Sequence, residues 1–241
     1  YVDPFIGTGG HGHTYPGAVL PHGMVQLSPD TRLDGWDGCG GYHYSDSHIY
    51  GFTHTHLSGT GVSDYGDILL MPMTGEPSPD NKIYGSKFSH ANEKASAGFY
   101  SVKLEDDNIL AELATTIRVG FHRYKFSGSD NNKVIIDLKH RDEVIESYLK
   151  IINDHTIAGL RRSKAWANNQ YVYFVIEFSK PFVKAGFWQN DVLMSSGTTD
   201  VKNSKNLKDF LEFENEMIMA KVAISAVSIE GAQNNLAKEI P

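Results

Sequence analysis

Short segments of alternating apolar residues, separated by turn-forming residues, recur along most of this chain and restrict it to an all-β fold. The strongest is residues 171–178, which are rich in β-branched and aromatic side chains. About ten such segments at short spacing, with hardly a helix before residue 232, predict an antiparallel β-sandwich of the supersandwich kind. The segments are residues 24–28, 67–71, 99–104, 109–118, 121–126, 134–138, 144–152, 155–162, 171–178, 182–188 and 217–229.

The connections between these segments complete the expected architecture. Turn formers between residues 99–104 and 109–118 predict a hairpin, and residues 144–152 and 155–162 predict a second one. The longest connections are residues 76–98 and 189–215, and the latter is expected to hold a short helix at 207–213. Trp166 and Trp188 lie in or beside strand-like runs and are expected in the core. A last helix is expected to begin near Ala232, and the sequence ends within it, which suggests a fragment of a longer protein. Residues 1–241 are expected to form one compact unit.

Glycine and histidine are concentrated in the first third of the chain. Residues 1–75 contain seven of the eleven His and fifteen of the 23 Gly, gathered in residues 7–13, 35–44 and 52–67. In the third run, polar residues alternate with glycines, which permit unusual backbone angles. The run lacks the apolar repeat of 2 or 3.6 residues that a buried strand or helix would show. Much of residues 1–66 is therefore expected to be irregular, and these three runs are interpreted as site loops.

The charge distribution limits the partners of these loops. The net charge is -7, and residues 1–75 hold seven Asp and no Glu against one basic residue, Arg32. Nucleic acid is excluded as a partner because its binding requires Lys and Arg. Neutral polyols or cations fit better. Cys39 is the single cysteine, so no internal disulfide can form, and no apolar run approaches the roughly 18 residues of a membrane span.

Two motifs in the loops suggest other functions. Residues 7–12 match the dinucleotide pattern G-x-G-x-x-G, but Pro16 follows too soon for the helix that this fingerprint requires. The pairs His11 with His13 and His54 with His56 have the spacing of zinc ligands on a strand, and His43, Asp64 and Asp67 could complete a site. The alternative is that these histidines make hydrogen bonds in a polar pocket, and no third ligand stands at a recognised spacing.

Trp36 is the residue that most suggests a ligand. It lies between Gly35 and Asp37-Gly38, and an aromatic ring in such a loop either stacks on a sugar or plugs the end of the sandwich. The residues alone leave both open. Neither a nucleophile triad around Ser58 or Cys39 nor a carboxylate pair for glycoside hydrolysis can be identified.

Several long motifs resemble the N-terminal domain of glycoside hydrolase family 92, the bacterial calcium-dependent exo-α-mannosidases. The resemblance runs nearly end to end, up to the apparent domain exit at residues 224–231. It rests on Val2-Asp3-Pro4-Phe5-Ile6-Gly7-Thr8-Gly9-Gly10-His11-Gly12-His13-Thr14, Pro16-Gly17-Ala18, residues 23–30, Gly41-Tyr42-His43-Tyr44 and residues 52–69.

The resemblance implies a β-sandwich that packs on a larger (α/α)₆ barrel outside this chain. In the family, that second domain carries the general acid, the general base and most calcium ligands, and the reaction inverts the anomeric centre. We therefore assign no catalytic residue and no metal ligand here, and expect calcium as a cofactor of the second domain. The full-length protein would be a secreted or periplasmic enzyme that trims mannose, with α-1,2 linkages favoured, from N-glycans or mannans. This chain by itself would be inactive.

The resemblance also suggests which residues of this chain form a pocket wall. Trp36 and Asp37 are expected to contact substrate, and His11, His13, His54, His56 and Asp64 are expected in the pocket or between the domains. The partners are a mannose-containing glycan and the catalytic domain of the same polypeptide. Two alternatives remain: a stand-alone carbohydrate-binding module without hydrolase activity, and a histidine-ligated metallohydrolase.

Overall fold

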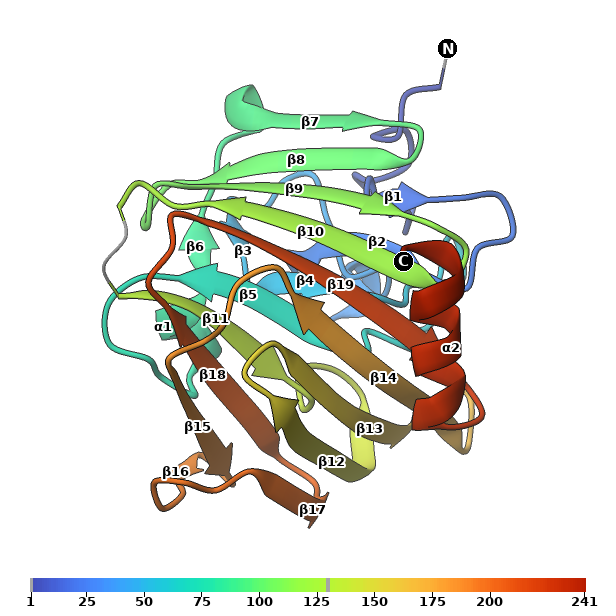
Figure 1. Ribbon diagram of the computed structural model, residues 1–241. Coiled ribbons are helices and arrows are strands. Elements are labelled where there is room, and N and C mark those ends of the chain that lie inside the picture. Colours follow the sequence, from blue (N-terminus) through green and yellow to red (C-terminus); the bar gives the residue numbers. More distant parts are fainter. Residues whose placement is uncertain (1, 129–130) are drawn as a thin grey trace.

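The computed structural model describes residues 2–128 and 131–241, and it is an antiparallel β-sandwich (Figure 1). Every strand pair is antiparallel, as expected where hairpins connect most neighbours. Two large sheets face one another, and the predicted all-β fold class is confirmed.

The first sheet has eight strands, and the three glycine-rich loops lie before or between its strands in the sequence. In spatial order they are β1 (Ala18–Val19), β2 (Gln26–Asp30), β4 (Gly51–Thr53), β5 (Leu69–Met73), β11 (Asn132–Asp137), β18 (Leu207–Phe213), β15 (Lys184–Gln189) and β16 (Val192–Leu193).

The second sheet has nine strands and includes both predicted hairpins, β8 with β9 and β12 with β13. In spatial order they are β17 (Asp200–Ser204), β12 (Glu143–Asn153), β13 (Thr156–Lys164), β14 (Gln170–Phe178), β19 (Met217–Ser225), β10 (Val119–Lys125), β9 (Ile109–Thr115), β8 (Phe99–Leu104) and β7 (Glu93–Ser96).

Smaller elements fill the connections. A two-stranded sheet of β3 (His48–Ile49) and β6 (Ser86–Lys87) lies beside the first large sheet, with the short helix α1 (Asn81–Tyr84). Two 3-10 turns, η1 (Trp36–Gly38) and η2 (His90–Asn92), and the helix α2 (Ile229–Glu239) complete the elements.

The main core lies between the two large sheets, where alternate residues of each strand point inward. Phe52, Leu70 and Ile135 of the first sheet and Tyr124 and Phe174 of the second are fully buried there. Burial of this apolar surface is the main term that stabilises the sandwich.

Helix α2 covers part of the opposite face of the nine-stranded sheet. Ala232 and Leu236 pack on Val119, Val175 and Ala223, which alternate with core residues along their strands (Figure 1). The Ser228 hydroxyl caps the helix by accepting a hydrogen bond from the Gly231 backbone N–H at 3.0 Å. The helix therefore begins at Ile229, three residues before the predicted start.

Two sequence predictions about elements are wrong. Residues 207–213 form strand β18 rather than a helix, because their backbone pairs with β11 on one side and β15 on the other, and residues of both faces are buried. Trp166 is 63% exposed in the turn between β13 and β14, whereas Trp188 is buried as predicted. The region expected to be irregular also contains β1, β3 and β4 besides β2.

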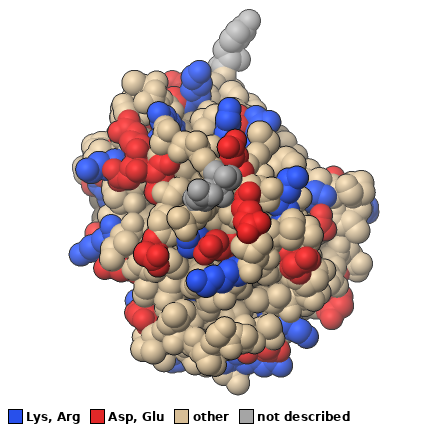
Figure 2. All heavy atoms as spheres, turned by 60° about the vertical axis from the view of Figure 1, so that its left-hand side comes forward, with Lys and Arg blue, Asp and Glu red and all other residues tan. Residues whose placement is uncertain are grey.

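Acidic and basic side chains are interspersed on the face shown in Figure 2, and neither sign dominates it. Among the helices of the described residues, none combines the length and hydropathy needed to cross a membrane.

Candidate functional site

Trp36 lies at the centre of a cluster made by the first two glycine-rich loops. It opens the 3-10 turn η1 after Gly35, whose φ of 75° places it in the left-handed region that glycine tolerates. The indole is 59% exposed. The His13 ring meets it edge to face at 4.3 Å between centroids, and the His11 ring lies at 5.1 Å. Trp36 is thus held in place from one side while much of it faces solvent.

Asp37 connects the two imidazoles of this cluster. Its Oδ1 atom is 2.7 Å from His11 Nδ1 and 3.2 Å from His13 Nε2. The hydrogen bond from His11, assisted by that from His13, lowers the pKa of the Asp37 carboxyl. Asp37 is therefore a carboxylate that accepts hydrogen bonds near neutral pH, which suits a sugar hydroxyl and does not suit a general acid.

The third glycine-rich loop packs against the same cluster. The Gly59 backbone N–H donates to the His13 carbonyl at 2.8 Å, and Gly61 lies against the indole. A Cβ atom on Gly61 would stand 3.0 Å from Trp36 Nε1, so only glycine leaves the ring undisturbed. The three loops that share one composition thus meet in space.

Arg141 joins these loops and was missed by sequence reasoning. Its guanidinium donates to the Gly38 carbonyl at 2.8 Å and to Ser63 Oγ at 3.0 Å, and it is buried. Arg141 follows β11, the strand that pairs with β5 directly after the third loop. Strand pairing of this kind, which the sequence does not specify, is what brings Arg141 to the site.

The other predicted site residues do not join this cluster. His54 is fully buried between the sheets, where Nδ1 donates to the Ile68 carbonyl and Nε2 lies 2.9 Å from His122 Nε2. His56 points to Asp30 and to the Gln26 carbonyl. These histidines diverge because strand β4 ends at Thr53.

Asp64 is also engaged inside the fold. One carboxylate oxygen accepts from the Tyr65 backbone N–H at 3.1 Å, and the other accepts from the Ala167 backbone N–H at 2.9 Å. It thereby fastens the turn that carries Trp166 to the third loop. In this structure Asp64 is a positioning residue.

Two further carboxylates beneath the loops are fully buried. Asp30 accepts hydrogen bonds from His140, Thr53 and His56, and although burial alone would raise its pKa, the imidazoles of His56 and His140 hold it well below its usual range. Asp67 pairs with the fully buried Arg161 at 2.5 Å. Both groups hold loops together and are inaccessible to a ligand.

Asp142, beside Ser63, is a partly buried carboxyl near the loops. Burial raises its pKa to about 6, against the opposing effect of Arg161 and Arg141. Its neighbours Asp64 and Asp67 are occupied by backbone N–H groups and by Arg161. They are therefore not free to activate water opposite Asp142, as glycoside hydrolysis would require.

A histidine-ligated metal centre finds no support in this geometry. Over residues 2–128 and 131–241, no three His, Cys, Asp or Glu side chains are grouped so that they could hold a metal ion. Only His11 of the four paired histidines is exposed, and the buried His54 and His56 contact different partners.

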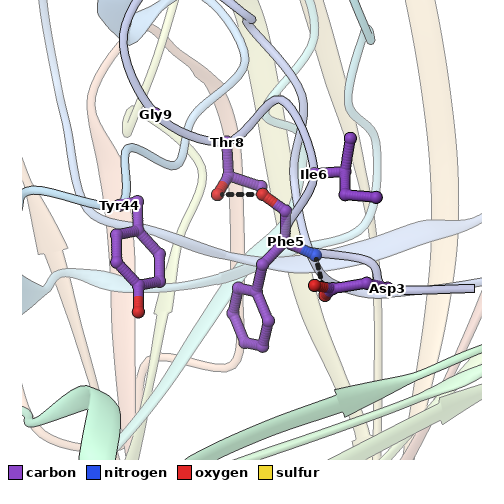
Figure 3. A pocket seen from close by; sticks show the side chains of 6 residues that line it. All are labelled: Asp3, Phe5, Ile6, Thr8, Gly9 and Tyr44. Carbon is purple, nitrogen blue, oxygen red and sulfur yellow. Dashed lines mark hydrogen bonds between the residues drawn. The ribbon is translucent and has the colours of Figure 1, made fainter.

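A separate hollow of about 380 Å³ lies beside the first loop, lined by Asp3, Phe5, Ile6, Thr8, Gly9 and Tyr44 (Figure 3). Phe5 packs edge to face on Tyr44 at 5.9 Å, and His90 stacks on Tyr44 at 4.0 Å. These contacts occupy the Tyr44 ring, so it is a poor platform for a sugar compared with Trp36.

Fold and site together define a class: an antiparallel β-sandwich domain whose glycine-rich loops present one exposed indole beside imidazole and carboxylate groups. Within this class the chain belongs to glycosyl hydrolase family 92, because the model of that family's N-terminal domain matches residues 1–225.

Solved structures agree with this assignment. The family GH92 α-mannosidase BT3965 from Bacteroides thetaiotaomicron is 38% identical over 99% of this chain, with a TM-score of 0.93. The inverting mannosidase BT2199 from the same species is 30% identical over 95% of the chain, with a TM-score of 0.83. This chain covers 34% and 31% of those two proteins.

A curated relative matches a smaller part of the chain. An uncharacterized secreted glycosidase from Arthroderma benhamiae is 33% identical in an alignment of 151 residues that covers 57% of this chain and 19% of that protein. The chain therefore spans about a third of the solved relatives and a fifth of the curated one.

Proposed function

We propose that this chain is the substrate-contributing domain of an exo-α-mannosidase. The observation that carries the proposal is the exposed Trp36 indole flanked by His11 and Asp37, in a chain that belongs to family 92. The apolar face of a sugar ring stacks on an indole, and its hydroxyls donate to a carboxylate such as Asp37. Trp36 and Asp37 would thus position the terminal mannose.

The bond-breaking groups are proposed to lie outside this chain. Inversion needs a general acid and a general base about 6.5–9.5 Å apart, with water between the base and the sugar. Near Trp36, both oxygens of Asp64 accept from backbone N–H groups. Asp37 contacts both imidazoles through Oδ1 and keeps Oδ2 for a sugar hydroxyl, and its lowered pKa does not suit a general acid. This arrangement supports a role in binding, with the acid and base supplied by the larger remainder of an enzyme like the inverting mannosidase BT2199.

Calcium is proposed to bind outside this chain as well. It prefers six to eight oxygen ligands, several of them carboxylates. The buried carboxylates Asp30 and Asp67 already contact His56, His140 and Arg161, and Asp37 contacts two imidazoles. These carboxylates of the described residues do not fit a calcium site, so no step is assigned to the ion here.

The wider context of the enzyme follows the same reasoning. The secreted relative supports a proposed secreted or periplasmic location. The proposed substrates are N-glycans or mannans, in keeping with the α-mannosidases of similar structure. The preference for α-1,2 linkages is tested by comparing hydrolysis of α-1,2-, α-1,3- and α-1,6-linked mannobiose.

The experiment that tests the role of Trp36 is kinetic. In the full-length protein, Trp36→Ala is expected to lower kcat/KM for α-mannobiose by about 10- to 100-fold, because a lost ring contact removes roughly 1–3 kcal/mol. Trp36→Tyr, which keeps an aromatic face, should retain much of the activity. Equal activity in all three proteins would remove Trp36 from the site.

A stand-alone carbohydrate-binding module is the alternative, favoured by the same exposed indole. It predicts that the full-length protein binds mannose through Trp36 and releases none from α-mannobiose. Release of mannose by the full-length protein excludes this alternative.

A further inference from the structure

A second hollow, of about 250 Å³, lies where one end of each sheet meets the third glycine-rich loop. Its polar wall is formed by Gln26 of β2, Thr55, Tyr65 and the first two residues of β14, Gln170 and Tyr171. Met24 and Ile224 contribute apolar surface. Aromatic rings next to amide groups over apolar carbon are the surface that sugar rings bind.

The Gln170 side chain is held in one orientation. Its Nε2 donates to Asp67 Oδ2 at 2.6 Å, and Asp67 is fixed in turn by Arg161 and by Thr55 Oγ1 at 2.7 Å. Because Nε2 is used in this way, the amide oxygen of Gln170 is left as an acceptor for a hydroxyl. Within residues 2–128 and 131–241 no protein group donates to that oxygen.

Tyr65 and Tyr171 are also fixed. Tyr65 has a φ of 76°, which costs a residue other than glycine about 1–3 kcal/mol, and its N–H is held by Asp64. The Arg162 guanidinium lies 4.9 Å from the centroid of the Tyr171 ring. Strained and prearranged side chains around a hollow are typical of binding sites.

This hollow lies within reach of the Trp36 cluster. Gly61 lies against the Trp36 indole, and Tyr65 is four residues further along the same loop. Four residues span at most about 14 Å, so one short oligosaccharide can contact both places. The residues that line the hollow are uncharged, which suits a neutral ligand.

We propose that the hollow at Tyr65, Gln170 and Tyr171 binds the inner sugar rings of an oligosaccharide whose terminal ring contacts Trp36. The proposal rests on the proposed function and adds a substrate class: neutral oligosaccharides of at least three sugars are preferred over single mannosides. Asp64 and Asp67 would support this subsite by holding Tyr65 and Gln170.

The test compares two substrates of the full-length protein, α-mannotriose and 4-nitrophenyl α-mannoside. The ratio of their kcat/KM values, trisaccharide over aryl mannoside, is expected to fall about tenfold in Tyr171→Ala. Tyr148→Ala is the matched control, because the Tyr148 ring of β12 also lies against a cation, Lys202 at 5.4 Å, and is outside the hollow. It should leave the ratio unchanged.

The outcomes are separable. Gln170→Leu should also lower the ratio. If Tyr171→Ala does not fold, Gln170→Leu tests the subsite in its place. An unchanged ratio in the folded variants, or an equal fall in Tyr148→Ala, overturns the subsite. If the parent protein hydrolyses neither substrate, the proposed function fails, and calorimetric titration with α-mannotriose then tests the hollow. Weaker binding by Tyr171→Ala than by Tyr148→Ala supports the subsite, and equal binding overturns it.

Discussion

Two histidines of this chain form a buried chain of hydrogen bonds in which every proton has a defined place. His54 Nδ1 donates to the Ile68 carbonyl at 2.6 Å, so its Nε2 accepts from His122 Nε2. The Tyr124 hydroxyl then donates to His122 Nδ1 at 2.7 Å. A further proton on His54 would place two N–H donors 2.9 Å apart, and burial disfavours a charge on His122.

Neutral buried histidines make the fold sensitive to acid. Burial lowers the pKa of His54 to about 4 and lowers that of His122 as well, from an ordinary value of 6.5. Below pH 6.5 the unfolded chain binds protons that the folded chain does not, so stability falls as the pH falls. His54 alone should cost about 2 kcal/mol between pH 6.5 and 5.

Urea unfolding at several pH values measures this loss, and histidine NMR assigns it. The window above pH 5 lies above the ordinary carboxyl pKa values, but it includes Asp142, whose raised pKa of about 6 stabilises the fold as the pH falls. The NMR titration is therefore what isolates His54. A His54 ring that titrates near 6.5 in the folded protein would contradict the assignment.

Gly61 is expected to matter for function and Gly59 for stability only. Both have φ near +70°, so alanine at either position should cost about 1–2 kcal/mol of folding free energy. A Cβ on Gly61 meets Trp36 Nε1 at 3.0 Å, whereas one on Gly59 meets no atom within 4 Å. Gly61→Ala should therefore lower kcat/KM for α-mannobiose in the full-length protein severalfold more than Gly59→Ala does. Equal losses would mean that the indole does not need its present position.

At the level of elements, the buried pair Asp67 and Arg161 fastens the third loop to strand β13. Asp67→Ala would leave the guanidinium charge unpaired inside the protein and should cost about 3–5 kcal/mol. The matched control is Glu146→Ala, which removes the partner of Arg162, the next residue along β13. That pair is 3.9 Å apart and partly exposed, so its loss should cost less than about 1 kcal/mol. Thermal or urea unfolding of both variants measures the difference, and similar losses would contradict the structural role of Asp67.

The sequence predicts local elements better than elements defined by their neighbours. Hairpins such as β12 with β13 follow from alternation around a turn, which is a local property. Strand β18 has buried residues on both faces, so Leu207, Phe210 and Leu211 imitate the spacing of a helix. Asp209 in this strand is fully buried, and burial raises its pKa well above the usual range. The neighbouring residues in the sequence do not predict this burial.

The candidate site was also predictable only in part, because its local composition is visible in the sequence and its spatial neighbours are not. Composition alone marks the three loops, and they meet around Trp36, His11, His13 and Asp37. Composition does not reveal which histidines turn inward. The location of His54 depends on Gly120 of β10, where a Cβ would stand 2.8 Å from the His54 ring.

At the level of the whole molecule, this chain corresponds to about a third of the solved mannosidases that it resembles. Its exposed indole, paired imidazoles and the Asp37 carboxylate are suited to holding a sugar, and Asp64 is bonded to backbone N–H groups. We therefore propose that this chain binds the sugar and that the rest of the protein cleaves the bond.

The most direct test is mannose release from α-mannobiose by this 241-residue chain and by the full-length protein, each with calcium and with a chelator. The account predicts release by the full-length protein alone, and loss of that release when calcium is removed. Release by the 241-residue chain would place the general acid and base among its own carboxylates. It would contradict the proposal that the catalytic groups lie outside this chain.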